Sequence, residues 1–136
     1  MQNFALLYAK DAMSKEVVTV GTGVKIREIE ALFEEHDFNA FPVIEGGRMV
    51  GLVTKLDFLK HFVFTPKTII PQYERLLEDP VRVIMSVTPL TISPETPLTR
   101  VLELMIETKR RSFPVVDGEG KLVGIISRED LMRKLK

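Results

Sequence analysis

The alternation of apolar and polar positions predicts the same series of elements twice along the chain. Each series begins with a short β-branched run, at Val17–Val20 and at Leu90–Ile92. A helix with one apolar face, two strands joined by a turn, and a second helix follow in both halves. The strands of these pairs are expected at residues 40–44, 48–53, 112–116 and 122–126. The order β-α-β-β-α in each half places the protein in the α+β class.

The first helix of each half is expected to pack through one apolar face. The positions at helical spacing are Ile26, Ile29, Leu32, Phe33 and His36 in the first half and Leu98, Val101, Leu102, Met105 and Ile106 in the second. Thr96 followed by Pro97 predicts an N-cap with proline at the first helical position. Met85, Met105 and Met132 recur on apolar faces, so we expect them in the core.

The two halves also match residue by residue. A shift of 72 residues places Met13-Ser14 on Met85-Ser86, and it places Phe41-Pro42-Val43 on Phe113-Pro114-Val115. One inserted residue near Gly120 then aligns the remainder. A collinear match of this length indicates an internal duplication.

The duplication defines the expected organisation of the chain. We assign residues 1–62 to a first repeat with an N-terminal segment, 63–80 to a connector, and 81–136 to a second repeat. Residues 1–10 and 72–78 are each expected to form a short helix.

Composition excludes several classes of function. The 136 residues include 19 Lys and Arg against 19 Asp and Glu, so balanced charge argues against binding to nucleic acid or to an acidic membrane surface. The sequence has no cysteine, and with only His36 and His61 a metal site is not expected. No apolar run approaches the roughly 20 residues of a membrane span, and the first ten residues lack a signal-peptide pattern. We therefore expect a cytoplasmic protein.

The strongest local motif, Gly-x-x-Thr/Ser-x-x-Asp, occurs once in each repeat, at Gly51–Asp57 and Gly124–Asp130. A hydroxyl residue three positions before an acidic residue is typical of a capping box, which needs no ligand. The same geometry suits a phosphate, because a helix N-terminus presents free N–H groups and a partial positive charge. An Asp one turn along could accept hydrogen bonds from a ribose. Spacing alone favours the capping box.

Together and in duplicate, these motifs resemble the tandem CBS domain pair, also called a Bateman module. The resemblance covers about residues 10–60 and 81–135, and it rests on both Phe-Pro-Val strands, the turn at 117–120 and the Gly-x-x-Thr/Ser-x-x-Asp ends. It implies two βαββα repeats packed sheet to sheet with pseudo-twofold symmetry. It also implies clefts that hold adenosine-containing ligands such as AMP, ADP, ATP or S-adenosylmethionine.

The resemblance further implies which residues form two nucleotide sites. Thr54 in the first repeat and Ser127 in the second would contact phosphate, and Asp57 and Asp130 would contact ribose. The remaining residues would line the adenine or the cleft edge: Ser14, Val18, Asn39, Ala40, Phe41 and Pro42 in the first site, and Ser86, Leu90, Arg111, Ser112, Phe113 and Pro114 in the second.

Charged residues beside these motifs distinguish the two sites. Lys55 and Arg128 each follow the hydroxyl residue and could bind a polyphosphate. The basic run at 109–111 either completes the last turn of a helix or contacts an anion at the cleft. The second site ranks slightly higher, because the segment at 21–23 and the shorter turn at 45–48 depart from the family pattern in the first repeat.

These observations favour a ligand-sensing regulatory module over an enzyme. The sequence contains no nucleophile–base arrangement, P-loop or zinc motif. An adenosyl ligand would signal through conformational change or an effector protein, and the family resemblance implies a homodimer. The alternative is a ligand-free structural dimerisation scaffold whose capping boxes serve stability.

Overall fold

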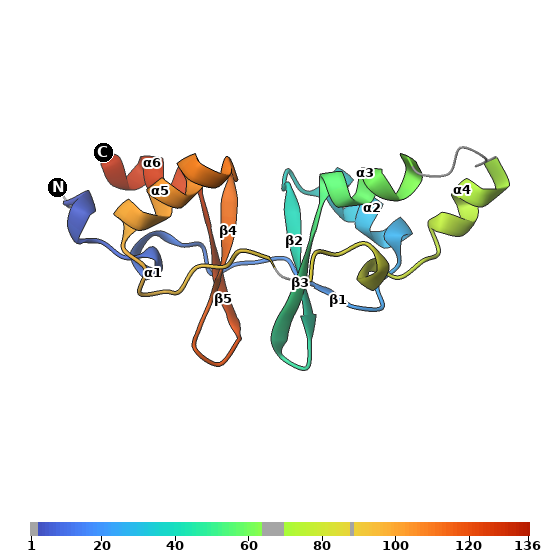
Figure 1. The fold of residues 1–136 in the computed structure, drawn as a ribbon, viewed down its shortest axis with the longest axis horizontal. Coiled ribbons are helices and arrows are strands. Elements are labelled where there is room, and N and C mark those ends of the chain that lie inside the picture. The colour runs from blue at the N-terminus through green and yellow to red at the C-terminus, as the bar shows by residue number, and fades with distance from the viewer. Residues whose placement is uncertain (1–2, 64–69, 88) are drawn as a thin grey trace. The chain divides into compact units, whose positions relative to one another are not determined.

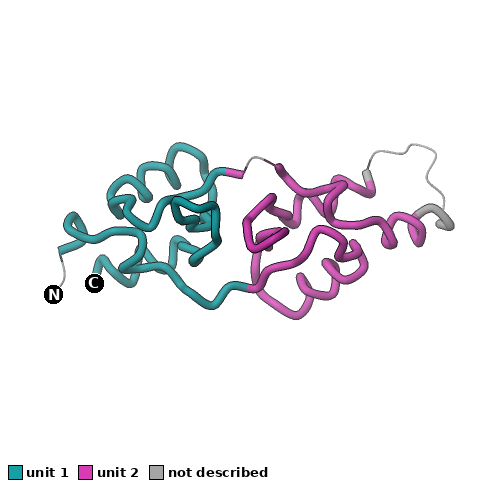
Figure 2. Tube along the Cα trace, turned by 90° about the horizontal axis from the view of Figure 1, so that it is seen from below, with its two compact units in different colours: residues 1–17, 90–136 teal, residues 18–89 magenta. Residues whose placement is uncertain are grey.

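The computed structural model describes residues 3–63, 70–87 and 89–136, and residues 64–69 of the expected connector lie outside this description. The chain divides into two compact units (Figure 2). Unit 1 contains residues 1–17 and 90–136, and unit 2 contains residues 18–89. The opening segment of each repeat therefore belongs to the unit that contains the rest of the other repeat.

Unit 2 is built around the sheet β1-β2-β3 (Figure 1). Its strands and helices are β1 (Val20–Gly21), α2 (Ile26–Glu35), β2 (Ala40–Glu45), β3 (Arg48–Thr54), α3 (Lys55–Val63), α4 (Ile70–Leu76) and the 3₁₀ turn η2 (Val81–Val83). β1 runs parallel to β2, and β2 runs antiparallel to β3. Gly46 and Gly47 both have positive φ between the paired residues Glu45 and Arg48, as a tight two-residue hairpin turn requires.

Unit 1 repeats this plan around the antiparallel pair β4-β5. Its elements are η1 (Phe4–Leu6), α1 (Ala9–Ala12), α5 (Leu98–Thr108), β4 (Ser112–Val116), β5 (Leu122–Ser127) and α6 (Arg128–Leu135). Ile92 pairs with Val115 through an isolated parallel bridge, in the place that β1 has in unit 2. The α+β class and both strand pairs predicted from the sequence are therefore confirmed.

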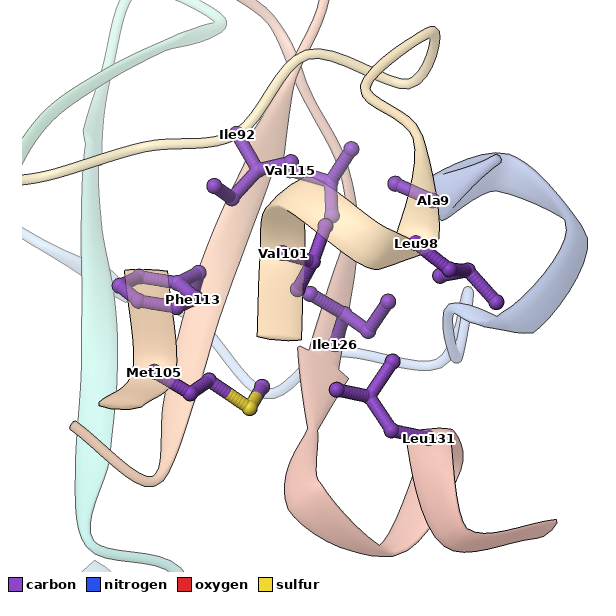
Figure 3. Packing of buried hydrophobic residues seen from close by; sticks show 9 residues of the cluster. All are labelled: Ala9, Ile92, Leu98, Val101, Met105, Phe113, Val115, Ile126 and Leu131. Carbon is purple, nitrogen blue, oxygen red and sulfur yellow. The ribbon is translucent and has the colours of Figure 1, made fainter. Parts of the chain in front are cut away.

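Each unit has its own hydrophobic core. Phe41 in unit 2 and Phe113 in unit 1 occupy equivalent strand positions and are fully buried. Burial of a phenylalanine side chain stabilises a fold by about 1.5–3 kcal/mol. Figure 3 shows the unit 1 cluster, in which the helix residues Val101 and Met105 and the α6 residue Leu131 gather with strand residues and with Ala9 of the N-terminal segment.

The exchanged segments are fixed by equivalent backbone hydrogen bonds. In unit 1, the N–H of Leu98 at the start of α5 donates to the carbonyl of Leu7 at 2.9 Å. In unit 2, the N–H of Ile26 at the start of α2 donates to the carbonyl of Asp79, also at 2.9 Å. Each exchanged segment therefore satisfies an N–H group that a helix N-terminus leaves without an intrahelical partner.

The short first strands predicted at 17–20 and 90–92 were too long. Only Val20 and Gly21 form β1, and only Ile92 pairs in unit 1. The predicted residues that do not pair, 17–19 and 90–91, lie on the N-terminal side of the paired positions. The helix predicted at 72–78 is present as α4, shifted toward the N-terminus, and the one expected within 1–10 is present as η1 and the start of α1.

Three further expectations need correction. Pro97 is the N-cap of α5, so Thr96 lies outside the helix that it was expected to cap. Met132 is 60% exposed rather than part of the core. Leu102 and Ile106 of α5 are exposed as well. In the part of the chain that the structure describes, no helix has the length and apolar character needed to cross a bilayer.

Candidate functional site

The candidate site in unit 2 lies at the corner where β2 begins and β3 passes into α3. The strand register pairs Ala40 with Thr54. The backbone N–H of Lys55 donates to the carbonyl of Asn39 at 3.1 Å. Asn39 and Ala40 at the start of β2 therefore meet Thr54 and Lys55 around the N-terminus of α3.

Thr54 and Asp57 form a reciprocal capping box at this corner. The N–H of Thr54 donates to Asp57 Oδ2 at 2.9 Å, and the N–H of Asp57 donates to Thr54 Oγ1 at 3.0 Å. Among the described residues the threonine hydroxyl acts only as an acceptor, so its own proton is available for another acceptor. Within residues 3–63, 70–87 and 89–136, Asp57 Oδ1 has no hydrogen-bond partner. Both side chains are half-buried.

The corner in unit 1 has the same framework. Ser112 pairs with Ser127 across the ladder, and the N–H of Arg128 donates to the carbonyl of Arg111 at 3.0 Å. The N–H of Ser127 donates to Asp130 Oδ2 at 2.8 Å, and the N–H of Asp130 donates back to Ser127 Oγ at 3.3 Å. Both repeats therefore contain the capping box that the spacing predicts.

The two corners differ in how many polar atoms are already engaged. The hydroxyl of Ser127 donates to Asp130 Oδ2 at 3.0 Å, so its proton is used. Arg133 forms an ion pair with Asp130 Oδ1. The Asp130 side chain is only 4% exposed. Every oxygen of the unit 1 box therefore has an intramolecular partner, in contrast to the unit 2 box.

The charge around the two corners also differs. Unit 1 presents the exposed residues Lys109, Arg110, Arg111 and Arg128. The guanidinium Nη2 of Arg128 donates to the carbonyl of Lys109 at 3.2 Å. Lys109 is the left-handed C-cap of α5, so the basic run follows the helix instead of completing its last turn. Unit 1 is the more cationic corner.

The corresponding residues of unit 2 are Asp37, Phe38, Asn39 and Lys55. Phe38 is 43% exposed and stacks on His36 with 5.2 Å between ring centroids and 4° between planes. Sequence reasoning missed this ring pair, of which Phe38 is the exposed member next to Asn39. Alignment of the two repeats could have drawn attention to it, because Phe38 takes the position that the cationic Arg110 has in the second repeat.

The Phe-Pro strands can reach a ligand only through their backbone. The side chains of Phe41, Pro42, Phe113 and Pro114 are buried. Val18 and Leu90 are partly buried against the cores of unit 2 and unit 1 respectively. Asn39, Lys55, Arg111 and Arg128 are exposed, and Ala40 and Ser112 are half-buried.

Ser14 and Ser86 do not join the repeats to which the sequence assigned them. Ser14 exchanges backbone hydrogen bonds with Ile125 of β5, so it belongs to the unit of Ser127. Ser86 does the same with Leu52 of β3, so it belongs to the unit of Thr54. The cause is the reciprocal exchange of segments, which places Ser14 in unit 1 and Ser86 in unit 2.

Two other features lie outside these corners. Among the residues that the structure describes, no group of three or more His, Cys, Asp or Glu is arranged to hold a metal ion. His61 Nε2 lies 3.0 Å from Asp79 Oδ2, so this pair links α3 to the segment that caps α2.

Sequence comparison places both repeats in one family. The model of the CBS domain matches residues 9–63 and again residues 81–136. The CBS domain-containing protein YhcV of Bacillus subtilis is 30% identical over 90% of this chain and 81% of its own length. An A-adding tRNA nucleotidyltransferase of Geobacter sulfurreducens is 32% identical over 92% of this chain, which spans only 13% of that enzyme. The chain likewise spans 24% of an inosine-5'-monophosphate dehydrogenase of Korarchaeum cryptofilum.

Solved structures share the fold over almost the whole chain. CBSX2 of Arabidopsis thaliana in complex with AMP is 27% identical with a TM-score of 0.79, covering 94% of this chain and 95% of that protein. The CBS domain pair of MJ0100 in complex with 5'-methylthioadenosine and S-adenosyl-L-methionine is 25% identical with a TM-score of 0.74, covering 95% of each chain. With both repeats matched and the fold shared, the chain belongs to the CBS domain family as a tandem pair.

Proposed function

We propose that this protein is a regulatory module that binds an adenosine-containing ligand at the Thr54–Asp57 corner of unit 2. The observation that carries the proposal is the unused hydrogen-bonding capacity of that corner. Thr54 has a free hydroxyl proton, and Asp57 Oδ1 has no partner in the described part of the chain. The proposal therefore prefers the first site, whereas the sequence pattern ranked the second slightly higher.

Each group has a role that its chemistry allows. The Thr54 hydroxyl would donate to a phosphate oxygen at the N-terminus of α3, where the helix dipole favours negative charge. The exposed ammonium group of Lys55 would add to that attraction. Asp57 Oδ1 would accept from ribose hydroxyls, and the base would lie along the backbone from Asn39 with Phe38 available for stacking.

Related proteins support this ligand class. CBSX2 has been solved with AMP, and the MJ0100 pair with 5'-methylthioadenosine and S-adenosyl-L-methionine. AMP, ADP, ATP and S-adenosylmethionine all contain adenosine, so the ribose and base contacts proposed for unit 2 suit each of them. The tail of the ligand, which differs among these compounds, would be selected near Thr54 and Lys55.

The proposed output is regulatory and not catalytic. Relatives named as enzymes match this chain over only 13% and 24% of their lengths, so their names give no support for assigning those activities to this chain. A ligand can bias a conformational equilibrium only by its differential affinity for the two states. We propose that such a bias reaches an effector protein or a second copy of this chain in a homodimer.

The alternative is a structural scaffold, and the unit 1 corner favours it locally. There the Ser127 hydroxyl and both oxygens of Asp130 are satisfied by the chain itself. A capping box whose polar atoms all have partners within the chain stabilises α6 without a ligand. If unit 2 behaved in the same way, the protein would bind no nucleotide at all.

Thermal shift measurements with AMP, ATP and S-adenosylmethionine separate these functions. A ligand at 100 times its dissociation constant adds about 2.7 kcal/mol of stability, which a melting curve resolves easily. We expect Asp57→Asn to remove the ligand-dependent shift, because the amide supplies neither the carboxylate charge nor both acceptors. Asp130→Asn, the matched control in unit 1, should keep it. A wild-type protein that none of the three compounds stabilises would overturn the proposal, as would an undiminished shift in Asp57→Asn.

A further inference from the structure

The loop that enters the first strand of each hairpin lies beside the start of the following helix. In unit 2 this is the α2–β2 loop (residues 36–39), and in unit 1 it is the α5–β4 loop (residues 109–111). The N–H of Lys55 donates to the carbonyl of Asn39, and the N–H of Arg128 donates to the carbonyl of Arg111. The same backbone hydrogen bond therefore fixes both loops, and their side chains can be compared position by position.

The two loops differ in charge at every compared position. A shift of 72 residues sets each cation of the α5–β4 loop opposite a residue without positive charge in unit 2. The pairs are Lys109 and Asp37, Arg110 and Phe38, and Arg111 and Asn39. All six residues are exposed. The unit 1 loop therefore offers three cations to an anionic ligand, whereas the unit 2 loop offers none at these positions and adds a carboxylate.

Carboxylates also lie close to Lys55 in unit 2. Lys55 lines an open groove between α2 and α3 together with Glu30 and Glu34 of α2. The repeat alignment replaces these two carboxylates by Leu102 and Ile106 in unit 1. Because opposite charges offset each other, the attraction that Lys55 exerts on a distant anionic group is reduced by its neighbours.

We propose that the unit 2 site selects adenosyl ligands whose 5′ tail carries at most one phosphate group, and that it discriminates against ADP and ATP. The inference rests on the proposed function and narrows its ligand class. A single phosphate is served by the Thr54 hydroxyl proton and by Lys55. A second and a third phosphate would bring more negative charge toward Asp37 and the α2 carboxylates, and the α2–β2 loop has no cation at 37–39 to receive it.

Isothermal titration calorimetry of the full chain measures this selectivity with AMP, ADP, ATP and S-adenosylmethionine in a buffer free of divalent cations. Only binding that Asp57→Asn removes is assigned to unit 2. AMP or S-adenosylmethionine is expected to bind more tightly than ATP by about fivefold or more in low salt. The two arms show whether the preferred tail is a phosphate or a sulfonium. ADP or ATP binding as tightly as the better of the two would overturn the inference.

Salt separates repulsion by charge from exclusion by size. Added salt screens interactions between exposed charges. The preference for AMP or S-adenosylmethionine over ATP should therefore decrease as the salt concentration rises. A preference that is independent of salt would show that the space available to the tail decides, and it would overturn the electrostatic basis proposed for the selectivity.

Transfer of cations from unit 1 tests the residues themselves. The double variant Asp37→Lys/Asn39→Arg gives the α2–β2 loop two cations of the α5–β4 loop, and it should raise the affinity for ATP relative to AMP by about tenfold. Neither side chain has a hydrogen bond or ion pair among the described residues, so the fold should be retained. An unchanged ratio of the two affinities would overturn the inference.

Glu45→Lys is the matched control, because it makes the same change of charge as Asp37→Lys at another exposed position of unit 2. Glu45 is the last residue of β2, about 16 Å along the strand from Ala40 at the corner. The ratio of ATP to AMP affinity should stay at its wild-type value in this variant. A change as large as that of the double variant would show an effect of overall charge and would contradict selection by the loop.

The same titrations distinguish failure of this inference from failure of the proposed function. Equal affinities for AMP, ADP and ATP that all depend on Asp57 would reject the selectivity and leave the ligand site in place. Absence of binding by all four compounds would reject the ligand site itself, and the selectivity with it.

Discussion

The carbonyl oxygen of Ser14 lies 2.7 Å from the position that a Cβ atom on Gly124 would occupy. The carbonyl oxygen of Ser86 lies at the equivalent place over Gly51, at 2.9 Å. In both units the Met-Ser dipeptide of one repeat crosses the strand glycine of the other repeat. The glycine in each Gly-x-x-Thr/Ser-x-x-Asp motif is thus explained by close packing of an exchanged segment, without any ligand.

Replacement of this glycine should therefore destabilise the protein. In Gly124→Ala the new methyl group would overlap both the backbone of Ser14 and the side chain of Met13, so both contacts must open. Overpacking of this kind costs typically about 1–3 kcal/mol, which urea denaturation measures. Gly21→Ala is the control, because among the described residues nothing lies within 4 Å of its Cβ position. Equal stability of Gly124→Ala and wild type would contradict the close crossing.

Local patterns were sufficient to predict both hairpins and the capping boxes. β2 and β3 are neighbours in sequence with a two-residue turn, and the hydroxyl and carboxylate of each box are three residues apart. Nothing local indicates that Ser14 pairs with Ile125, because the same segment could satisfy its backbone in either repeat. Assignment of Ser14 and Ser86 to a site therefore needed the three-dimensional structure.

The sequence also could not predict which carboxylate oxygens of the two capping boxes have a partner within the chain. Arg133 and Lys60 each follow the box Asp by three residues, a spacing that allows ion pairs in both helices. The structure shows the ion pair with Asp130 and none between Lys60 and Asp57, whose side chains are both described. The same spacing therefore gives an ion pair in one helix and not in the other, so spacing alone does not decide which carboxylate keeps a free oxygen.

Removal of the unit 1 hydroxyl should lower stability more than removal of the unit 2 hydroxyl. Loss of an N-cap side chain costs about 0.5–2 kcal/mol. Ser127→Ala should fall in the upper part of that range, because Asp130 is nearly buried and loses a hydrogen-bond donor. Thr54→Ala should fall lower, since Asp57 is half-buried and receives nothing from the threonine hydroxyl. Urea denaturation measures both, with Thr99→Ala on the exposed side of α5 as the control.

Arg133 should contribute to stability where its counterpart Lys60 does not. Arg133→Ala leaves the nearly buried Asp130 Oδ1 without its cation, and an unsatisfied polar atom of this kind costs about 1–3 kcal/mol. Lys60→Ala should change the free energy of unfolding by no more than about 0.5 kcal/mol, because the exposed Lys60 makes no ion pair in the described structure. Chemical denaturation of the two variants measures both free energies of unfolding. Equal decreases in the two variants would contradict a stabilising role of the Arg133–Asp130 ion pair.

The ion pairs that join α2 to the end of α4 predict a pH dependence of stability. Hydrogen bonds from Lys25 and then Arg27 hold the pKa of Glu78 below its ordinary value of 4.5. A carboxylate whose pKa is lowered by folding contributes stability above its unfolded pKa, and that contribution is lost as the pH falls through the folded pKa. Wild type should therefore melt at a higher temperature than Glu78→Gln at pH 7, and the difference should shrink below about pH 4.5. The groups are exposed, so the difference should be small and should decrease in high salt. Glu16→Gln is the control, since exposed Glu16 has no ion pair among the described residues. The difference in melting temperature between Glu16→Gln and wild type should not change with pH, whereas the difference for Glu78→Gln should decrease as the pH falls.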